Sequence, residues 1–343
     1  MEHQPFVSIL TPVYNGAEFL ADCIECVLKQ THQNFEYIIV NNASTDGTLE
    51  IALEYAKKDQ RIRVHDNEKF VGVIANHNIA FNLMSPKAEY CKVVSADDLI
   101  YPTCVEKMVE LGQTHPDVSI IGCFQLSGER ILWQGHCHPK RVFSGRELCR
   151  RIFLRGETTF GFGSPSSLIY RADIVRSSPE FYPNPSPHSD TSACFQHLRN
   201  SNYGFLYEIL SLERTHEATQ TSTSKKMERY LSAYLNDVVQ YGPFYLDAAE
   251  QKVVLMNVLK RYRKFLSAVY FTGTGSKEFW DYHRSRLAEL GYPINRFLLF
   301  RSAMGSVMQE AINPGQLLGK VWKRLSTKFN HRPAPGKHLG ASV

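Results

Sequence analysis

The sequence predicts an α/β protein with a mostly parallel central sheet flanked by helices and with a helical C-terminal extension. Before residue 102, β-rich segments alternate with helical ones, which is the rhythm of a parallel sheet. From about Ser224 the apolar residues recur at helical spacing. With 343 residues, 43% of them hydrophobic and 21% charged, the chain is long enough for two folded, water-soluble units.

Two strand–loop–helix units open the chain. Residues 6–12 form a β-rich run, and after a turn at residues 13–16 the apolar residues follow helical spacing up to Leu28. Residues 35–40 form a second β-rich run, and residues 41–47 are a polar turn before the next helical pattern.

Three further elements continue this rhythm: a strand at residues 62–65, a helix at 73–84 and a strand at 90–94. In an open parallel sheet, ligands bind beyond the carboxyl ends of the strands. Polar clusters follow three of these strands, at residues 11–16, 41–47 and 95–98. We therefore expect the three clusters to form one site.

The later part of the chain continues with strands and then turns helical. Further strands are expected at residues 118–124, 168–170 and 205–212, with a loop-rich stretch that contains residues 156–167. The helical patterns then lie at residues 226–241, 248–271, 276–290 and 296–312.

Basic residues concentrate in the last quarter of the chain. Residues 251–343 hold 16 Lys or Arg against 4 Asp or Glu, whereas residues 1–250 hold 23 against 30. This asymmetry predicts an anionic partner, either a membrane surface or a polyanion, and a solvated helical face is the alternative.

Composition and motifs exclude several classes of protein. The eight cysteines are dispersed, with one Cys-x-x-Cys at Cys23 and Cys26, which favours reduced thiols over a disulfide framework or a four-cysteine zinc site. No Gly-x-Gly-x-x-Gly follows the first strand, which argues against a dinucleotide-dependent oxidoreductase. No basic, apolar leader and no long apolar run is seen, so we expect a cytoplasmic protein.

Asp97 and Asp98 end the fourth predicted strand. Hard cations such as Mg²⁺ and Mn²⁺ prefer carboxylate oxygens, and a strand end holds such ligands while leaving positions open for substrate phosphates. The pair therefore predicts a metal site. The alternative is that it caps the next helix.

Together these segments resemble the family-2 glycosyltransferases: VSILTPVYN at residues 7–15, Gln30-Thr31, VNNASTDGT at residues 40–48, and then the Asp pair. The resemblance covers roughly residues 5–222 and is strongest before residue 102. It implies a GT-A-like fold, an inverting transfer of a sugar from a nucleotide-diphosphate donor, and Mg²⁺ or Mn²⁺ on the donor pyrophosphate.

The resemblance also implies which residues bind the donor. The candidates are Thr11, Pro12, Tyr14, Asn15, Asn42, Asp46, His77, Asn78, Ala96, Asp97 and Arg214. The Tyr14 ring is a plausible platform for a nucleobase, although the loop also reads as a simple strand-to-helix turn. Asp46, with Ser44, is alternatively a helix cap.

The chain departs from the family pattern at three of these places. Asn41 and Asn42 stand where acidic residues are usual, so the base preference is open, since an amide both donates and accepts. His77 replaces an Arg, and Ser95 replaces the first acid of the metal motif. Asp97 therefore becomes the expected metal ligand, with Asp98 and His216, from an Arg-x-His element at residues 214–216, as further ligands.

An inverting transfer needs a base that deprotonates the acceptor hydroxyl. The family uses an acid of a Glu-Asp pair, and the matching residues are Ser189 and Asp190, which makes Asp190 the candidate base. His188 ranks second. Asp190 or Ser189 could alternatively cap the following helix. Residues 161–165 would shape the acceptor side.

The last predicted helix is basic and amphipathic. Apolar residues from Leu317 to Leu325 alternate with Lys320, Lys323, Arg324 and Lys328. It could lie on the inner face of an anionic membrane, where a lipid-linked acceptor would reside. Packing against the preceding helices or a twin subunit is equally compatible, and no nucleic-acid partner is expected.

The predicted organisation is therefore a nucleotide-sugar-dependent catalytic domain at residues 1–222, a basic helical extension at 223–332 and a flexible tail at 333–343. The predicted function is transfer to a saccharide or glycolipid hydroxyl in surface polysaccharide synthesis. Two alternatives remain: a nucleotide-sugar-binding module that has lost catalysis, motivated by the departures from the motif, and a nucleotidyltransferase.

Overall fold

The computed structural model describes residues 4–134, 139–155, 161–183, 186–214, 229–295 and 297–304. The chain divides into two compact units, residues 1–256 and residues 257–343. Each unit is described by itself below.

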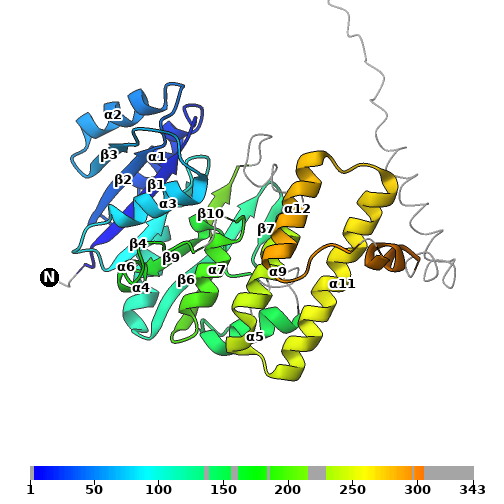
Figure 1. Ribbon diagram of the computed structural model, residues 1–343. Coiled ribbons are helices and arrows are strands. Elements are labelled where there is room, and N and C mark those ends of the chain that lie inside the picture. The colour runs from blue at the N-terminus through cyan, green and yellow to red at the C-terminus, as the bar shows by residue number, and fades with distance from the viewer. Residues whose placement is uncertain are drawn as a thin grey trace, which may run out of the picture. The chain divides into compact units, whose positions relative to one another are not determined.

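The first unit is built on one ten-stranded sheet, shown in Figure 1. Its strand order is β3-β2-β1-β4-β9-β6-β10-β5, with β7 beside β6 and β8 beside β10. The strands are β1 (Val7–Val13), β2 (Phe35–Asn41), β3 (Ile62–Asp66), β4 (Tyr90–Val93), β5 (Leu99–Ile100), β6 (Val118–Ser127), β7 (Arg130–Leu132), β8 (Val142–Ser144), β9 (Leu168–Arg171) and β10 (Asn202–Glu213).

The first four strands of this order are parallel, and their carboxyl ends lie at one edge of the sheet. All seven residues of β1 are buried, as expected for a strand covered on both faces. Val13 pairs with Asn41, and Asn41 with Asp66, so the ends of β1, β2 and β3 are in register. The rest of the sheet is mixed, since β9 runs antiparallel to both β4 and β6.

Helices cover the sheet in the first unit (Figure 1). Among the described residues the labelled helices are α1 (Leu20–Leu28), α2 (Thr48–Lys58), α3 (Val73–Asn82), α4 (Cys104–Thr114), α5 (Gly145–Arg155), the 3-10 helix η1 (Pro165–Ser167), α6 (Ala172–Arg176), α7 (Ser189–His197), α9 (Arg229–Gln240), α10 (Gly242–Tyr245), α11 (Ala248–Thr272) and α12 (Lys277–Glu289). In α1 the buried residues are Leu20, Cys23, Ile24 and Val27, so one apolar stripe faces the core.

The α/β fold class with a central sheet and C-terminal helices is confirmed. The capping alternative for the Asp pair is wrong, because the next helix, α4, begins only at Cys104, after the short strand β5. The stretch taken as loop-rich contains η1, which follows Ser164.

The second unit contains the last part of α11 and all of α12. The Tyr262 hydroxyl and His283 Nδ1 lie 2.5 Å apart in its interior, and the Ser267 hydroxyl donates to the Leu299 carbonyl at 2.7 Å. Within the residues that the structure describes, no helix combines the length and the apolar character needed to cross a membrane.

Candidate active site

Two loops meet at the carboxyl ends of β1 and β2, and hydrogen bonds join them. The Asn15 amide donates to the Ser44 hydroxyl at 3.0 Å, and Asn15 Oδ1 accepts from the Thr45 amide at 2.8 Å. The Gly16 amide donates to Thr48 Oγ1 at 2.9 Å. Asn15 has a φ of 50°, a left-handed conformation that Asn tolerates better than most residues. The predicted polar clusters at residues 11–16 and 41–47 are therefore joined by hydrogen bonds.

Asp46 ties this structure to helix α2. Its carboxylate accepts from the Ala17 amide at 3.1 Å and from both the amide and the hydroxyl of Thr48, the amide at 3.0 Å. Burial pushes the pKa of Asp46 upward, but the hydrogen bonds from Thr48 and Ala17 outweigh burial and lower that pKa. Asp46 is thus an ionised anchor of both loops.

An exposed pair of aromatic rings lies beside these loops. Tyr14 is 46% exposed and Phe70 is 56% exposed, and their ring centroids are 4.7 Å apart at an angle of 61°. Exposed rings at a sheet edge can stack on a nucleobase. Phe70 was not among the predicted residues, because it lies in the loop between β3 and α3, outside the segments that carry the motif.

Thr11, Pro12 and Asn42 are buried behind the loops. The Thr11 hydroxyl donates to the Val94 carbonyl at 2.8 Å and so links β1 to the end of β4. The Asn42 side chain donates to the Val71 carbonyl at 2.9 Å and accepts from the Val71 amide at 3.0 Å. Asn42 therefore holds the β3–α3 loop from within.

The neighbouring Asn41 differs from Asn42 in having an open acceptor. Its Nδ2 donates to Asp66 at 2.7 Å, while its buried Oδ1 has no hydrogen-bond partner among the described residues. Asn41 and Asn42, at the end of β2, thus stand where the family usually has acids. Most of their polar atoms form hydrogen bonds within the protein.

His77 and Asn78 on α3 both contact Tyr182. The His77 and Tyr182 rings stack with centroids 5.5 Å apart. Asn78 exchanges two hydrogen bonds with the Tyr182 backbone, each 3.0 Å long. Burial lowers the pKa of His77, opposed by its hydrogen bond to the Val73 carbonyl. His77 and Asn78 stand where the family often has Arg-Asn. Through Tyr182 they fasten α3 to the segment that precedes α7.

Asp97 and Asp98 follow the end of β4, with Asp98 6% exposed and Asp97 half-buried. Burial, together with the charge of Asp97, raises the pKa of Asp98 to about 7. The Glu213 charge adds to this effect, and hydrogen bonds from the Ser166 hydroxyl and the Arg214 amide oppose it. The structure thus brings Asp97, Asp98 and Arg214 together.

These residues fit a divalent cation of the oxygen-preferring kind. A buried carboxyl beside two further acids gains from a positive charge, and Mg²⁺ or Mn²⁺ commonly takes only one or two carboxylates plus waters and phosphates. In the described ranges no group of three or more His, Cys, Asp or Glu side chains is arranged around one point. His216, the third predicted ligand, lies outside the described residues.

The loop that bears Asp97 is fastened to η1. The Ser95 amide donates to the Ser166 hydroxyl at 2.9 Å. Below it lies Lys92, which is 0% exposed and donates to the carbonyls of Ser166 at 2.5 Å and Leu168 at 3.0 Å. Lys92 was not predicted as a site residue, although a lysine inside an otherwise apolar strand was a signal.

Arg214, the last residue of the described range 186–214, lies beside this group. Its guanidinium donates to Asp22 on α1 at 2.8 Å. Ala96 lies half-buried next to Asp97. Arg214 thus reaches helix α1, which follows the first predicted donor loop.

The predicted acceptor loop packs around Gln125 on β6. Gln125 Oε1 accepts from the Ser164 hydroxyl at 2.9 Å and from the Trp133 indole at 3.2 Å. A Cβ on Gly161 would lie 2.5 Å from the Trp133 ring, so only glycine allows this contact. Gly163 has a φ of +146°, which also favours glycine.

Asp190 lies in the first turn of α7, and its Oδ1 accepts from the Thr191 amide at 2.7 Å. The helix itself has His188 at its N-cap, with no side-chain cap. Burial raises the pKa of Asp190 to about 6, while the His188 charge lowers it. Burial, and next the Asp190 charge, raises the pKa of Tyr182, so the candidate base lies near the residue that α3 holds.

Known proteins of similar sequence show to which family this arrangement of residues belongs. The sequence profile of glycosyl transferase family 2 matches residues 8–177, which include the donor loops, the Asp pair and η1. The chain belongs to this family.

Two relatives named as glycosyltransferases illustrate the range of similarity. The glycosyltransferase GlyG of Streptococcus pneumoniae is 24% identical over 291 residues, covering 80% of this chain and 93% of the relative. A putative teichuronic acid biosynthesis glycosyltransferase, TuaG of Bacillus subtilis, is 36% identical over 107 residues, or 31% of this chain and 42% of the relative.

Solved structures identify the fold of this glycosyltransferase. Staphylococcus aureus TarS 1–349 in complex with UDP-GlcNAc has a TM-score of 0.62 at 18% identity, over 83% of this chain and 80% of that one. Mannosyltransferase PcManGT from Pyrobaculum calidifontis, in complex with GDP-Man and Mn²⁺, has a TM-score of 0.52 at 12% identity, over 91% and 87% of the two chains. The fold is that of the GT-A glycosyltransferases, as predicted.

Proposed function

We propose that the protein is an inverting, metal-dependent glycosyltransferase that moves a sugar from a nucleotide-diphosphate donor to a hydroxyl of a saccharide or glycolipid. One observation carries this proposal: the carboxyl groups of Asp97 and Asp98 lie together after the end of β4, and buried Asp98 accepts hydrogen bonds from the Ser166 hydroxyl and the Arg214 amide. The solved relatives hold UDP-GlcNAc in one case and GDP-Man with Mn²⁺ in the other.

The donor would bind at the carboxyl ends of β1, β2 and β4. The Tyr14 ring would stack on the base, and the loops anchored by Asn15 and Asp46 would frame the nucleotide. Asp97, with Asp98 and the predicted ligand His216, would hold Mg²⁺ or Mn²⁺. When bound, the metal supplies positive charge that stabilises the leaving diphosphate.

Asp190 would act as the base. Its carboxylate takes the proton of the acceptor hydroxyl, and the oxygen forms a bond to the anomeric carbon from the face opposite the leaving group. The bond from that carbon to the diphosphate oxygen breaks, and its electron pair leaves with the nucleoside diphosphate. With a pKa of about 6, Asp190 is ionised at neutral pH and still basic enough to accept a proton.

The acceptor class is inferred from the family and from the tail. A relative named for teichuronic acid biosynthesis supports a surface polysaccharide. The basic residues beyond residue 304 would place the enzyme on an anionic membrane surface, where lipid-linked acceptors reside. Residues 1–222 would carry the catalysis, and α9 in the same compact unit would support them.

Asp190→Asn tests the base. We expect nucleoside diphosphate release from UDP-GlcNAc or GDP-mannose, with water as acceptor, to fall about 100-fold or more, while donor binding measured by thermal shift is retained. The matched control is Asp173→Asn, because exposed Asp173 makes the same contact to the next amide, at 2.8 Å. Unchanged release in Asp190→Asn removes Asp190 as the base.

Asp97→Asn tests the metal. In the wild type, Mn²⁺ should increase the thermal stabilisation given by one nucleotide diphosphate, and about 2.7 kcal/mol is available at 100 times the dissociation constant. The variant should lose the increase that depends on Mn²⁺ and keep the stability of the ligand-free protein. A full Mn²⁺ effect in Asp97→Asn would show that Asp97 is not a ligand.

A further inference from the structure

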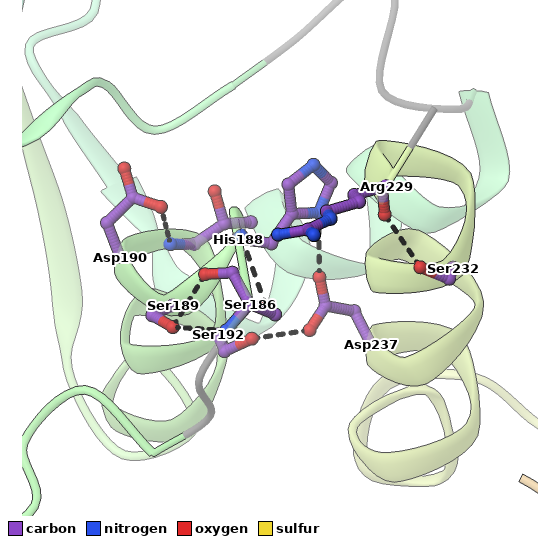
Figure 2. A network of polar contacts seen from close by, with 9 residues as sticks. Ser186, His188, Ser189, Asp190, Ser192, Arg229, Ser232 and Asp237 are labelled. Atoms are coloured by element: carbon purple, nitrogen blue, oxygen red, sulfur yellow. Dashed lines mark hydrogen bonds and ion pairs between the residues drawn. The ribbon is translucent and has the colours of Figure 1, made fainter. Parts of the chain in front are cut away.

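A buried aspartate on α9 contacts the start of α7. Asp237 is 0% exposed, and its Oδ2 lies 3.1 Å from Nδ1 of His188. Its Oδ1 accepts from the Ser192 hydroxyl at 2.6 Å. Both partners belong to the turn that carries Asp190, so one carboxylate binds the two sides of that turn (Figure 2).

Both the ring and the backbone of His188 are held in place. The ring of Tyr230, also on α9, lies 5.3 Å away, and the His188 amide donates to the Ser186 hydroxyl at 3.2 Å. The His188 carbonyl accepts from the Ser192 amide at 2.7 Å, as the first bond of α7. With Nδ1 directed at Asp237, the orientation of the imidazole is determined.

In Figure 2 the Asp190 carboxyl projects above the start of α7, whereas the His188 ring lies between α7 and α9, above Asp237. The charge of His188 lowers the pKa of Asp190, so the two groups are in electrostatic reach of each other. Asp237 therefore contacts a group that acts on the candidate base.

Packing alone does not explain Asp237. Burial raises the pKa of its carboxyl, and the hydrogen bond from His188 opposes that rise. A buried ion pair is often no more stabilising than apolar residues of similar volume. We therefore attribute the presence of the Asp237 carboxylate to the orientation that it imposes on the His188 ring.

We propose that Asp237 and His188 are a positioning pair for the catalytic base: Asp237 anchors the His188 ring and the first turn of α7 to α9, and so holds in place the turn that carries Asp190 and the charge of His188 near it. This inference rests on the proposed role of Asp190. It assigns a role to α9, which lies outside the segment that the family profile matches.

The surroundings of Asp190 define what a pH profile reports. The His188 charge lowers the pKa of Asp190 and the Asp237 charge raises it. Burial first, and then the Asp190 charge, raises the pKa of both Tyr182 and Cys194, so these groups are neutral at the pH of the assay. Arg229, at the start of α9, belongs to the same network (Figure 2).

His188→Gln provides the first measurement. The rise of nucleoside diphosphate release with pH follows ionisation of Asp190, and loss of the His188 charge, which lowers the pKa of Asp190, should move this rise to higher pH. We expect a shift of about half a pH unit or more, which is roughly a threefold loss of rate on the rising limb. A merely structural role for His188 would lower the rate without moving the limb.

Asp237→Asn provides the second measurement, made at pH 8, where Asp190 is ionised in every variant. We expect kcat to fall about tenfold with KM for the donor nearly unchanged. If Asp237 acts through His188, the same substitution in the His188→Gln background should change kcat less than twofold. Gln240→Ala is the control, because Gln240 is an exposed residue at the other end of α9, and wild-type rates are expected.

A titration that needs no substrate completes the test. The carboxyl ¹³C signal of Asp190, assigned with Asp190→Asn, is followed against pH in the full chain, and His188→Gln should raise its midpoint. If the effects of His188→Gln and Asp237→Asn on kcat are fully additive, or if the Asp190 midpoint does not move, the positioning pair is overturned. The role of Asp190 as the base is then unaffected. Wild-type release in Asp190→Asn instead overturns the base and with it this inference.

Discussion

Lys92 is the buried charge closest in sequence to the Asp pair. Burial lowers its pKa, yet its ammonium donates to the carbonyls of Ser166 and Leu168, which flank the end of η1. The same η1 residue, Ser166, accepts from the Ser95 amide. Through these bonds one lysine holds the loop that bears Asp97.

Lys92→Met should therefore destabilise the protein. It fills a similar volume but leaves buried carbonyl oxygens without a donor, at about 1–3 kcal/mol for such groups. Urea denaturation would measure the loss, and nucleotide binding should weaken in parallel because the loop is released.

The matched control for Lys92→Met is Lys29→Met. Lys29 is exposed and pairs with Glu25 one helical turn away, so its loss should cost less than about 0.5 kcal/mol. Equal stability of the two variants would contradict the role assigned to Lys92.

Helix α3 and the Tyr182 segment are joined by one side chain. Asn78 presents a donor and an acceptor to the Tyr182 backbone, as a neighbouring strand would. Tyr182 is 2% exposed, so both bonds are shielded from water. The contact fixes the distance between the donor side and the start of α7.

Asn78→Ala should break this link. We expect a loss of about 1–3 kcal/mol in stability, because two backbone groups lose their partners, and a fall in the rate of transfer larger than the loss of donor binding. Thermal unfolding and steady-state kinetics would measure the two effects.

Asn82→Ala is the control on the same helix. Asn82 makes one exposed bond, to the Pro179 carbonyl at 3.0 Å, and its removal should leave both measurements close to the wild type. A transfer rate in Asn78→Ala equal to that of Asn82→Ala would show that the link does not position the base.

The regular strands and helices of the first hundred residues could be predicted because each carries its own periodicity. Strands β5, β7 and β8 could not, since they have two or three residues each and exist only through pairing with β10 or β6. The same holds for the site. Asp190 follows from a local motif, whereas His188 and Asp237 are 49 residues apart and no local pattern joins them.

At the scale of the whole molecule, one histidine, His197, contributes to the response to acid. Burial lowers the pKa of His197 to about 4, opposed by the charge of Asp173. The unfolded chain therefore binds a proton to this residue between its ordinary pKa and about 4, while the folded protein does not. Above the ordinary histidine pKa, His197 does not reduce the free energy of unfolding. As the pH falls from there towards 4, the free energy of unfolding decreases.

We expect His197→Gln to flatten the fall of stability between pH 7 and pH 4. After allowance for partial exposure the difference should be about 2 kcal/mol, measured by denaturant unfolding at several pH values. Gln196→Ala, at the exposed residue before His197 on α7, should retain the slope of the wild type. An unaltered slope in His197→Gln would assign the acid sensitivity to other groups.

The exposed rings of Tyr14 and Phe70 have a thermodynamic consequence. In the free protein their apolar surface is hydrated, and a base stacked on it would release that water. Removal of apolar surface from water makes the heat capacity of binding negative. The enthalpy of donor binding in the proposed complex should therefore become more favourable on warming, and its temperature slope would report the area that the two rings cover.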